Sequence, residues 1–320
     1  MKYHQLTQEE RYAISGGLRI GRTGRELAEE LGRSPSTVSR EIRRNATVHD
    51  GAYRREKAQS YSVAKRRRSR RGSRFSEEAL QQVDVAIRNR WSPEQIVATF
   101  RAEGKRVPSH ETIYRRLRQD KRDGGTLYRY TRIMSKMRRK RYRSPHTRGV
   151  LLGKKHISER QPIVDERGRF GDWEGDTVMG KMGSPHCLLT LVERKSGYTI
   201  IRKLPARTTV EAIAAIAAAI KTLQNMFHTF TFDNGTEFHG YEHLEHEFGV
   251  KCYFATPYHS WERGSNENLN GLVRQYLPKG RCLRSVTQAD CDEIANALNN
   301  RPRKRLGFKT PNTILLGLED

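Results

Sequence analysis

Three kinds of sequence feature are absent from this chain of 320 residues, and each absence excludes a class of protein. No apolar run reaches membrane-spanning length and no signal peptide opens the chain, so we expect neither a membrane protein nor a secreted one. The four cysteines contain no Cys-x-x-Cys pair, which argues against a zinc ribbon and against a disulfide framework. No Walker motif is present, so we expect no nucleotide cofactor.

Positive charge, in contrast, is abundant and unevenly distributed. The net charge of the chain is +25, and residues 1–160 hold 41 Lys and Arg against 17 Asp and Glu. Residues 161–320 hold only 20 against 19. A basic half of this kind attracts a polyanion. Because no membrane segment is present, nucleic acid is the predicted partner, in the cytoplasm or the bacterial nucleoid.

The first 46 residues predict a helix-turn-helix DNA-binding domain. Ala28, Gly32 and Val38 occupy the diagnostic positions of that motif, and Ser34 caps the second helix. The alternative is a three-helix cluster whose basic face contacts only solvent. The face that we expect to contact bases and phosphates carries Thr37, Ser39, Arg40, Arg43 and Arg44.

Two basic stretches, residues 47–75 and 121–160, have no apolar periodicity and are predicted to be linkers. The first of them is expected to order along a phosphate backbone or to remain solvated. Its predicted DNA contacts are Arg66, Arg67, Arg68, Arg70 and Arg71.

Residues 76–120 predict a second helix-turn-helix-like domain with a longer turn. Ser92 and Ser109 cap two of its helices. A plain helical linker domain is the alternative. The polar face expected to meet DNA carries Thr112, Arg115 and Arg116.

Residues 161–320 change to a strand period and predict an α/β domain. The expected order of elements is three strands, a helix, a strand, a helix, a strand and a helix, which implies a mixed five-stranded sheet with helices on its faces. The predicted strands and helices are Asp172–Met179, Cys187–Glu193, Tyr198–Leu204, Thr209–Gln224, a strand ending at Asp233, Tyr241–Phe248, Val250–Ala255 and Thr287–Asn300.

Acidic residues on separate elements of this domain predict a metal site. Asp233 follows a β-prone run, and Glu267 lies near the start of a helix. Asp172, Glu174 and Asp176 share one face of a strand, so the spacing alone does not choose between them. Each acid in isolation has an ordinary role, but together they suit hard cations that prefer oxygen ligands.

Two further sets of residues accompany the acids. Asn270 and Arg274 lie on the same helical face as Glu267 and are candidates to touch DNA, although that face could equally contact solvent. His239, His243 and His246 have helix-compatible spacing and could be read as a zinc site, but no fourth ligand is evident.

Three motifs resemble those of the DDE transposases and retroviral integrases. They are Gly171-Asp172-Trp173-Glu174-Gly175-Asp176, Phe232-Asp233-Asn234-Gly235, and the run from Tyr258 to Asn268 that contains Glu267. Together with the segment from Asn270 to Gly280, they closely resemble bacterial transposases of the insertion sequence 30 family. The resemblance covers nearly the whole chain and implies an RNase H-like, integrase-type catalytic domain.

The resemblance assigns the catalytic and metal-binding triad to Asp176, Asp233 and Glu267. It implies two Mg²⁺ ions, with Mn²⁺ as a substitute, and phosphodiester cleavage followed by 3′-hydroxyl strand transfer. It also implies binding to double-stranded DNA at terminal inverted repeats and a circular intermediate. Because one active site cannot comfortably handle two DNA ends, we expect a homodimer or larger homo-oligomer. The alternative is an inactive DNA-binding repressor that uses its carboxy-terminal domain to dimerise.

Overall fold

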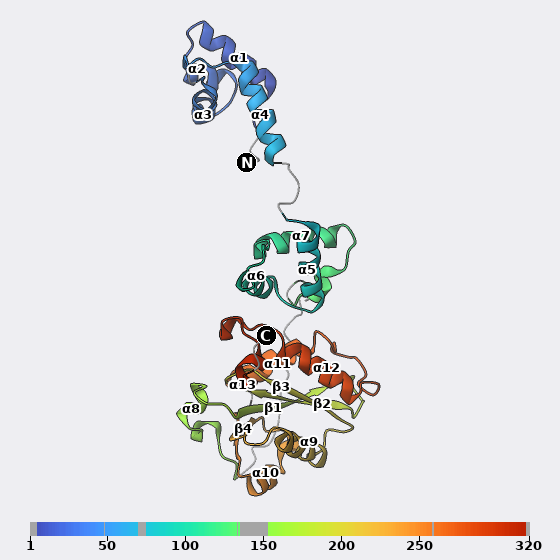
Figure 1. Cartoon of the computed structure of the whole chain (residues 1–320). Helices are drawn as coiled ribbons and strands as arrows, with labels where there is room; N and C mark the ends of the chain where they lie inside the picture. Colours follow the sequence, from blue (N-terminus) through green and yellow to red (C-terminus); the bar gives the residue numbers. More distant parts are fainter. Residues whose placement is uncertain are drawn as a thin grey trace. The chain divides into compact units, whose positions relative to one another are not determined.

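A computed structural model describes residues 5–47, 49–69, 75–132, 134, 153–257 and 259–317 of the chain (Figure 1). The chain divides into two compact units, Met1–Arg74 and Phe75–Asp320. The second unit contains a small helical domain followed by the α/β domain. Within the described ranges, no helix is both long enough and apolar enough to cross a membrane.

The first unit begins with three short helices whose starts are fixed by their own side chains. Capping boxes begin α1 (Gln8–Arg19) and α2 (Gly24–Glu30), because in each a threonine and a glutamate satisfy each other's backbone N–H groups. The Ser34 hydroxyl accepts a hydrogen bond at the start of α3 (Pro35–Asn45), where proline occupies the first turn.

These three helices enclose a small apolar core. Ile14, Leu27, Ala28 and Val38 are buried where the helices meet. Gly32 has a φ of +60° in the turn between α2 and α3, a conformation that favours glycine. The predicted helix-turn-helix domain is therefore confirmed, with the residues that were expected to form its turn and its core.

A fourth helix, α4 (Arg55–Ser69), occupies much of the stretch predicted as the first basic linker. It lies beside α1 (Figure 1) and packs through Ala58, which is fully buried. The linker prediction is wrong for residues 55–69. The helix lacks an apolar stripe because a single small side chain and a polar network, rather than a hydrophobic face, hold it in place.

The helical domain of the second unit contains α5 (Glu77–Arg88), α6 (Pro93–Ala102) and α7 (His110–Arg122). Ser92 and Ser109 cap α6 and α7 as the sequence predicted. The connection between α6 and α7 is longer than the turn between α2 and α3. The largest fully buried side chains of the domain are Ile87, Ile96, Ile113 and Leu117.

A mixed five-stranded sheet forms the centre of the α/β domain. Its order is β3-β2-β1-β4-β5. The first three strands pair antiparallel, whereas β1 with β4 and β4 with β5 pair parallel. The strands are β1 (Asp172–Met179), β2 (Cys187–Glu193), β3 (Thr199–Leu204), β4 (Thr229–Phe232) and β5 (Lys251–Phe254). The predicted mixed sheet is confirmed.

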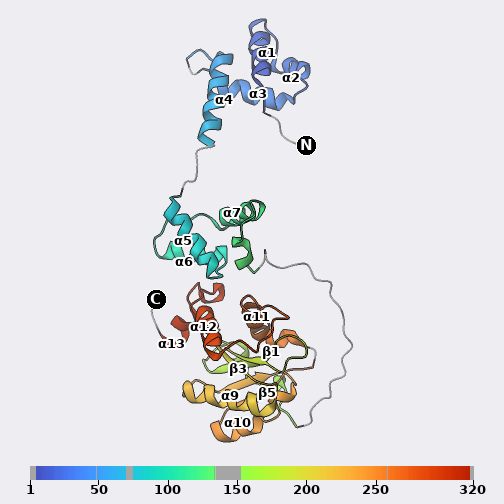
Figure 2. The ribbon, with the colours of Figure 1, turned by 90° about the vertical axis from the view of Figure 1, so that its right-hand side faces the viewer.

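Helices cover both faces of this sheet (Figure 2). On one face, α9 (Thr209–Thr222) and α10 (Tyr241–Phe248) pack on a core that is rich in phenylalanine. On the other face, α11 (Gly264–Val273) and α12 (Gln288–Asn299) pack on an aliphatic core. Side chains alternate across β1, so that Trp173 faces the first core and Val178 faces the second.

Short elements lie before and after the sheet. The one-turn α8 (Pro162–Asp165) precedes β1, and α13 (Pro311–Leu316) follows α12. Residues 153–160 were predicted to belong to the second linker, and that prediction is wrong for them. His156 bridges to Phe254 at the edge of the sheet, and the Lys155 carbonyl accepts a hydrogen bond of 2.9 Å from the Phe254 amide. The linker prediction is also wrong at the start of the stretch, because α7 continues to Arg122 and a 3-10 turn, η1 (Leu127–Tyr130), follows it. Residue 133 and residues 135–152 lie outside the described residues.

A buried arginine connects three helices of the first unit. The Arg11 guanidinium on α1 donates to Glu41 Oε1 at 2.7 Å on α3 and to Gln59 Oε1 at 3.0 Å on α4. It also donates to the Leu6 carbonyl at 2.9 Å. The Arg11 side chain is 4% exposed and that of Glu41 is 12% exposed, so neither charge is well solvated without its partner.

Replacing Arg11 by methionine should therefore lower the free energy of unfolding of residues 1–74 by about 3–5 kcal/mol, because it leaves Glu41 buried and unpaired. Urea denaturation followed by circular dichroism measures this change. The matched control is Arg22→Met, which removes an exposed ion pair to Glu30 and should cost less than about 1 kcal/mol. Equal costs for the two variants would show that the Arg11 network does not hold α4.

Candidate active site

Two of the predicted acids lie side by side at the end of a parallel strand pair. Asp172 pairs with Thr229 and Glu174 with Thr231 across β1 and β4. Extending this register by two residues places Asp176 next to Asp233, which directly follows the last residue of β4. The two carboxylates are close enough for the charge of Asp233 to act on the pKa of Asp176.

Hydrogen bonds distinguish Asp176 from the two other acids on the same face of β1. Asp172 is 1% exposed and binds the Arg169 guanidinium at 3.1 Å and the Thr229 hydroxyl at 2.8 Å. Glu174 is fully buried and binds the Arg194 guanidinium. Because both of those carboxylates are committed to arginine partners, Asp176 is the acid of β1 that remains for chemistry at the end of the strand.

The Asp176 carboxylate is held in one orientation. Its Oδ1 accepts a hydrogen bond of 2.8 Å from the Thr177 amide, and its Oδ2 accepts one of 2.7 Å from the Asn270 side chain on α11. Burial raises the pKa of Asp176 and the neighbouring Asp233 raises it further, while Arg263 acts in the opposite direction.

Arg263, which sequence reasoning missed, lies against both carboxylate-bearing strands. Its Nη1 donates to the Gly175 carbonyl at 3.0 Å, and its Nη2 lies 3.6 Å from Asp233 Oδ2. The side chain is 11% exposed. Arg263 belongs to the third motif, the run from Tyr258 to Asn268, but the motif gave it no role, because its contacts depend on the turn that precedes α11.

Glu267 lies on the first turn of α11 and is exposed. It precedes Asn270 by one helical turn, and Asn270 is bonded to Asp176, so the helix carries Glu267 on the side of Asp176. Across the described parts of the chain, no group of three or more His, Cys, Asp or Glu side chains is arranged to hold a metal ion. Instead, the Arg263 guanidinium provides positive charge beside Asp233.

The acids nevertheless fit a divalent cation in their chemistry. Carboxylates are the ligands that Mg²⁺ and Mn²⁺ prefer, and Asp176 and Asp233 lie close enough to interact electrostatically. The histidines do not form such a set. His243 pairs with Glu247 on its own helix at 2.9 Å, and His246 is exposed. His239 is half-buried, and burial lowers its pKa.

Asn270 and Arg274, predicted to touch DNA, contact the sheet in this structure. Asn270 lies between Asp176 and Thr190, whose hydroxyl is 3.1 Å from the Asn270 Oδ1. Arg274 donates to the Met179 carbonyl at 2.6 Å, at the end of β1. Both side chains therefore join α11 to the strand that carries Asp176, a contact that the sequence did not reveal.

Two charged residues on the opposite side of β1 were also missed. Glu237 is fully buried and accepts hydrogen bonds of 2.7 Å from both Thr177 and Arg207. Burial lowers the pKa of Lys154 to about 8, although Asp233 and Glu237 act in the opposite direction. Lys154 Nζ lies 3.8 Å from the centre of the Phe254 ring. A basic group thus lies near Asp233 on this side of the sheet.

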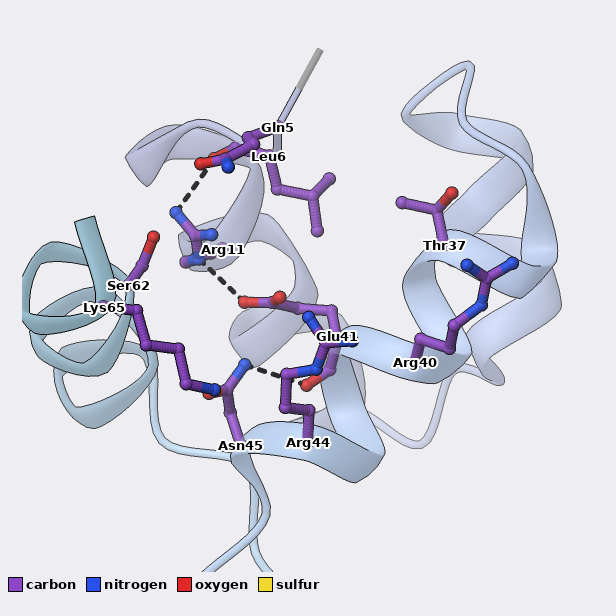
Figure 3. A pocket seen from close by; sticks show the side chains of 10 residues that line it. All are labelled: Gln5, Leu6, Arg11, Thr37, Arg40, Glu41, Arg44, Asn45, Ser62 and Lys65. Carbon is purple, nitrogen blue, oxygen red and sulfur yellow. Dashed lines mark hydrogen bonds and ion pairs between the residues drawn. The ribbon is translucent and has the colours of Figure 1, made fainter. Parts of the chain in front are cut away.

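The predicted DNA-binding face of the first unit lies beside a cavity of about 270 Å³ (Figure 3). Arg40, Arg44 and Thr37 contribute to its wall from α3, and Lys65 contributes from α4. The side chains of Ser39, Arg40, Arg43 and Arg44 are exposed, and that of Thr37 is half-buried. The side chains of Arg66, Arg67 and Arg68, and the whole of Arg70 and Arg71, lie outside the described structure.

In the second helical domain, the residues predicted to contact DNA differ in their exposure and in their partners. Arg115 is exposed on α7. Thr112 is exposed, and its hydroxyl lies 3.0 Å from that of Ser109, the residue that caps α7. Arg116 forms a bidentate pair with Asp84 on α5, at 2.8 Å and 3.2 Å. Arg116 therefore joins two helices of its own domain.

Comparison with known proteins connects the two units to one family. Family models match a helix-turn-helix domain over residues 2–45 and an integrase core domain over residues 167–260. The chain is 41% identical to the transposase for insertion sequence element IS4351 of Bacteroides fragilis, over 96% of this chain and 94% of that protein. It is 35% identical to the transposase InsI for insertion sequence element IS30C of Escherichia coli K12, over 97% and 83% of the two chains.

Among solved structures, the catalytic core domain of BIV integrase is similar to part of the chain. The similarity has a TM-score of 0.37 and 22% identity, and it covers 47% of this chain and 95% of that domain.

The position of Arg263 predicts competition with divalent cations. Arg263→Gln should raise the affinity of the full chain for Mn²⁺ about tenfold, because it removes a positive charge next to Asp233. Titration calorimetry measures the affinity. The control is Arg202→Gln, which removes the same charge from an ion pair to Asp292 on the sheet's other edge and should leave the affinity unchanged. Unchanged or weaker binding by the Arg263 variant would show that Arg263 does not compete.

Proposed function

The chain belongs to the insertion sequence 30 family of transposases, and from this premise we propose that it moves its own insertion element by cutting and rejoining DNA. It would hydrolyse a strand at the element end and direct the freed 3′-hydroxyl to another phosphodiester. Similarity to the family suggests a circular intermediate. The observation that carries the proposal is the position of Asp176 beyond the end of the β1–β4 ladder, near Asp233 and bonded to the helix that bears Glu267.

In this proposal Asp176, Asp233 and Glu267 are the catalytic acids and hold divalent cations, two Mg²⁺ ions or Mn²⁺ in their place. Such ions neutralise the attacking and leaving oxygens of an in-line phosphodiester displacement. Asn270 and the Thr177 amide fix the direction of the Asp176 carboxylate, so that its position does not depend on the cation. Glu174 and Asp172 keep their arginine partners and have structural roles.

Binding of the element ends is proposed for the helical regions. In the first unit, α3 would read bases in the major groove through Arg40 and Arg43, while Arg44 and Lys65 would contact phosphates beside the cavity. In the second helical domain, Thr112 and Arg115 are the exposed candidates. Since one active site cannot serve two element ends at once, we propose a homodimer or larger assembly that acts on DNA of the bacterial nucleoid.

Replacing any one of Asp176, Asp233 and Glu267 by its amide should reduce metal-dependent nicking of a duplex with the element end by at least about a thousandfold, since each acid is needed for charge neutralisation. Affinity for that duplex should remain at the wild-type value. Gel analysis of nicked strands and fluorescence anisotropy measure the two quantities.

The controls are Glu242→Gln on α10 and Asp172→Asn on β1. The first removes an exposed carboxylate, and the second keeps the register of the strand. Both should retain nicking. An active Asp233→Asn protein would refute the assignment of the triad, and a wild-type protein that binds ends without nicking would favour a repressor.

The first unit should divide its contacts between bases and phosphates. Arg40→Ala should cost about 1–3 kcal/mol of binding free energy on the element end and little on a scrambled duplex, as expected for a base contact. Lys65→Ala should weaken both duplexes and reduce the slope of log affinity against log salt by about 0.9. Arg22→Ala, on the turn before α2, serves as a control. Equal losses on both duplexes for Arg40→Ala would contradict the base contact.

A further inference from the structure

A cavity of about 200 Å³ lies on the side of α11 that faces away from Asp176. Asn270 and Arg274 face β1, whereas Ser265, Asn268 and Leu272 line the cavity from the other side of the helix. Three arginines from the flanking segments complete the wall: Arg167, Arg303 and Arg305. We refer to this set, with Gly264 and Ser265 at the start of α11, as the arginine pocket.

The arginines of the pocket are held by neutral groups. Arg167 donates to the Arg194 carbonyl at 2.9 Å and to the Ser265 hydroxyl at 3.2 Å. Arg305 donates to the Lys195 carbonyl at 2.6 Å. Arg303 donates to the Leu298 carbonyl at 3.0 Å, and its buried Nε has no hydrogen-bond partner in the described structure. Among the described ion pairs, none includes any of these three arginines.

Acidic residues near the pocket do not balance its charge. Glu174 and Glu193 are both fully buried and contribute some opposite charge. However, Glu174 is bound to Arg194 and to the Asn266 amide, and Glu193 is bound to the Ser196 and Lys195 amides. Their carboxylates are therefore committed to other donors and leave the guanidinium groups of the pocket without direct counter-ions.

Mutual repulsion within the pocket is visible in the pKa values. Burial and the neighbouring Arg301 and Arg305 lower the pKa of Arg303 to about 9. Burial and Arg167 lower the pKa of Arg305, and burial and Arg194 lower that of Arg167. Each shift means that the charged form is less stable here than in water. An anion in the pocket would reverse that cost for all three side chains.

The start of α11 adds to the positive electrostatic potential of the pocket. The helix has ten residues and begins without a side-chain hydrogen bond at its N-cap, and its first two residues line the pocket. The N-terminus of a helix carries partial positive charge and offers N–H groups to anions. An arginine guanidinium can donate two parallel hydrogen bonds to two oxygens of one phosphate group. Glu174 already accepts a hydrogen bond from the Asn266 amide of this turn, so the feature that selects a tetrahedral oxyanion is the set of three arginines without ion-pair partners among the described residues, and the helix start adds to it.

We propose that the arginine pocket binds a phosphodiester group of the DNA on which this transposase acts, and so holds the duplex against the first turn of α11. This site rests on the proposed function, because it takes DNA as the substrate, and adds to it a contact that does not involve the triad. The contact lies on the same helical turn as Glu267, so a phosphate bound there would fix the position of the catalytic helix.

Ethylation interference on the full chain tests this proposal, using a duplex with the element end and no divalent cation. In the wild type, ethylation at one phosphate or two adjacent phosphates should weaken binding through this pocket. Arg305→Gln and Arg167→Gln should both lose that sensitivity at the same position and bind the unmodified duplex about tenfold more weakly at low salt. The lysine variants, Arg305→Lys and Arg167→Lys, should recover part of the affinity.

Arg202→Gln is the matched control, because it removes an arginine of the same domain that is paired with Asp292, and it should keep the wild-type pattern. Thermal unfolding verifies that each variant is folded, and the two glutamine variants test the pocket independently of each other. An unchanged interference pattern in both would overturn the proposal. Weaker binding with unchanged sensitivity to ethylation at every phosphate would also overturn it. That result would mean that the arginines hold the fold of this region and do not contact the DNA.

Free phosphate is the other possible source of the same anion. If inorganic phosphate raises the unfolding temperature of the wild type but not of Arg305→Gln, and the interference pattern is the same in both, the pocket serves free phosphate and the DNA assignment is wrong. The binding assay needs no cleavage. Consequently, an inactive triad would leave these results intact, and a failed phosphate assignment would leave the nicking experiments unaffected.

Discussion

The parallel pairing of β1 with β4 is the constraint on which the candidate active site depends. A shift of one residue would turn Asp176 to the other face of the sheet, away from Asp233. Aromatic packing supports this register, because the Trp173 ring on β1 stacks on the Phe227 ring just before β4, with 4.6 Å between the ring centres. Gly175 is part of this arrangement, since a Cβ atom there would lie 2.5 Å from the Phe232 ring.

Placing two carboxylates side by side has an electrostatic cost, and the surrounding residues are arranged to reduce it. Arg263 lies against Asp233 on the α11 side, and Lys154 lies near Asp233 on the other. Asn270 stabilises Asp176 with a neutral donor, which leaves the net charge of the pair available to an incoming cation. The site is therefore partly neutralised by Arg263 and Lys154, and the Asp176 carboxylate is oriented by its hydrogen bonds.

The sequence predicted the strands well because period and composition agree there, and β1 and β2 have the predicted bounds. It could not choose Asp176 over Asp172 and Glu174 by spacing, because all three share one face. The resemblance to the transposase family assigned Asp176, and the structure adds a physical difference: Asp172 and Glu174 bind arginines, whereas Asp176 accepts hydrogen bonds from neutral groups. Arg263 and α4 were missed for a related reason: their roles depend on single contacts, to Asp233 and through Ala58, rather than on any periodic signal.

α11 joins the parts of the site through two faces with different chemistry. One face carries Glu267, Asn270 and Arg274 toward β1, and the other presents Asn268 and Leu272 to the arginine pocket. Its first turn is fixed by Glu174, which binds the Asn266 amide at 3.1 Å while its other oxygen binds Arg194. A displacement of that turn would thus move Glu267 and break the hydrogen bond from the Asn266 amide to Glu174. Because Glu174 is fully buried, the loss of this donor would leave one of its carboxylate oxygens without a partner, and the first turn of α11 is held in place for that reason.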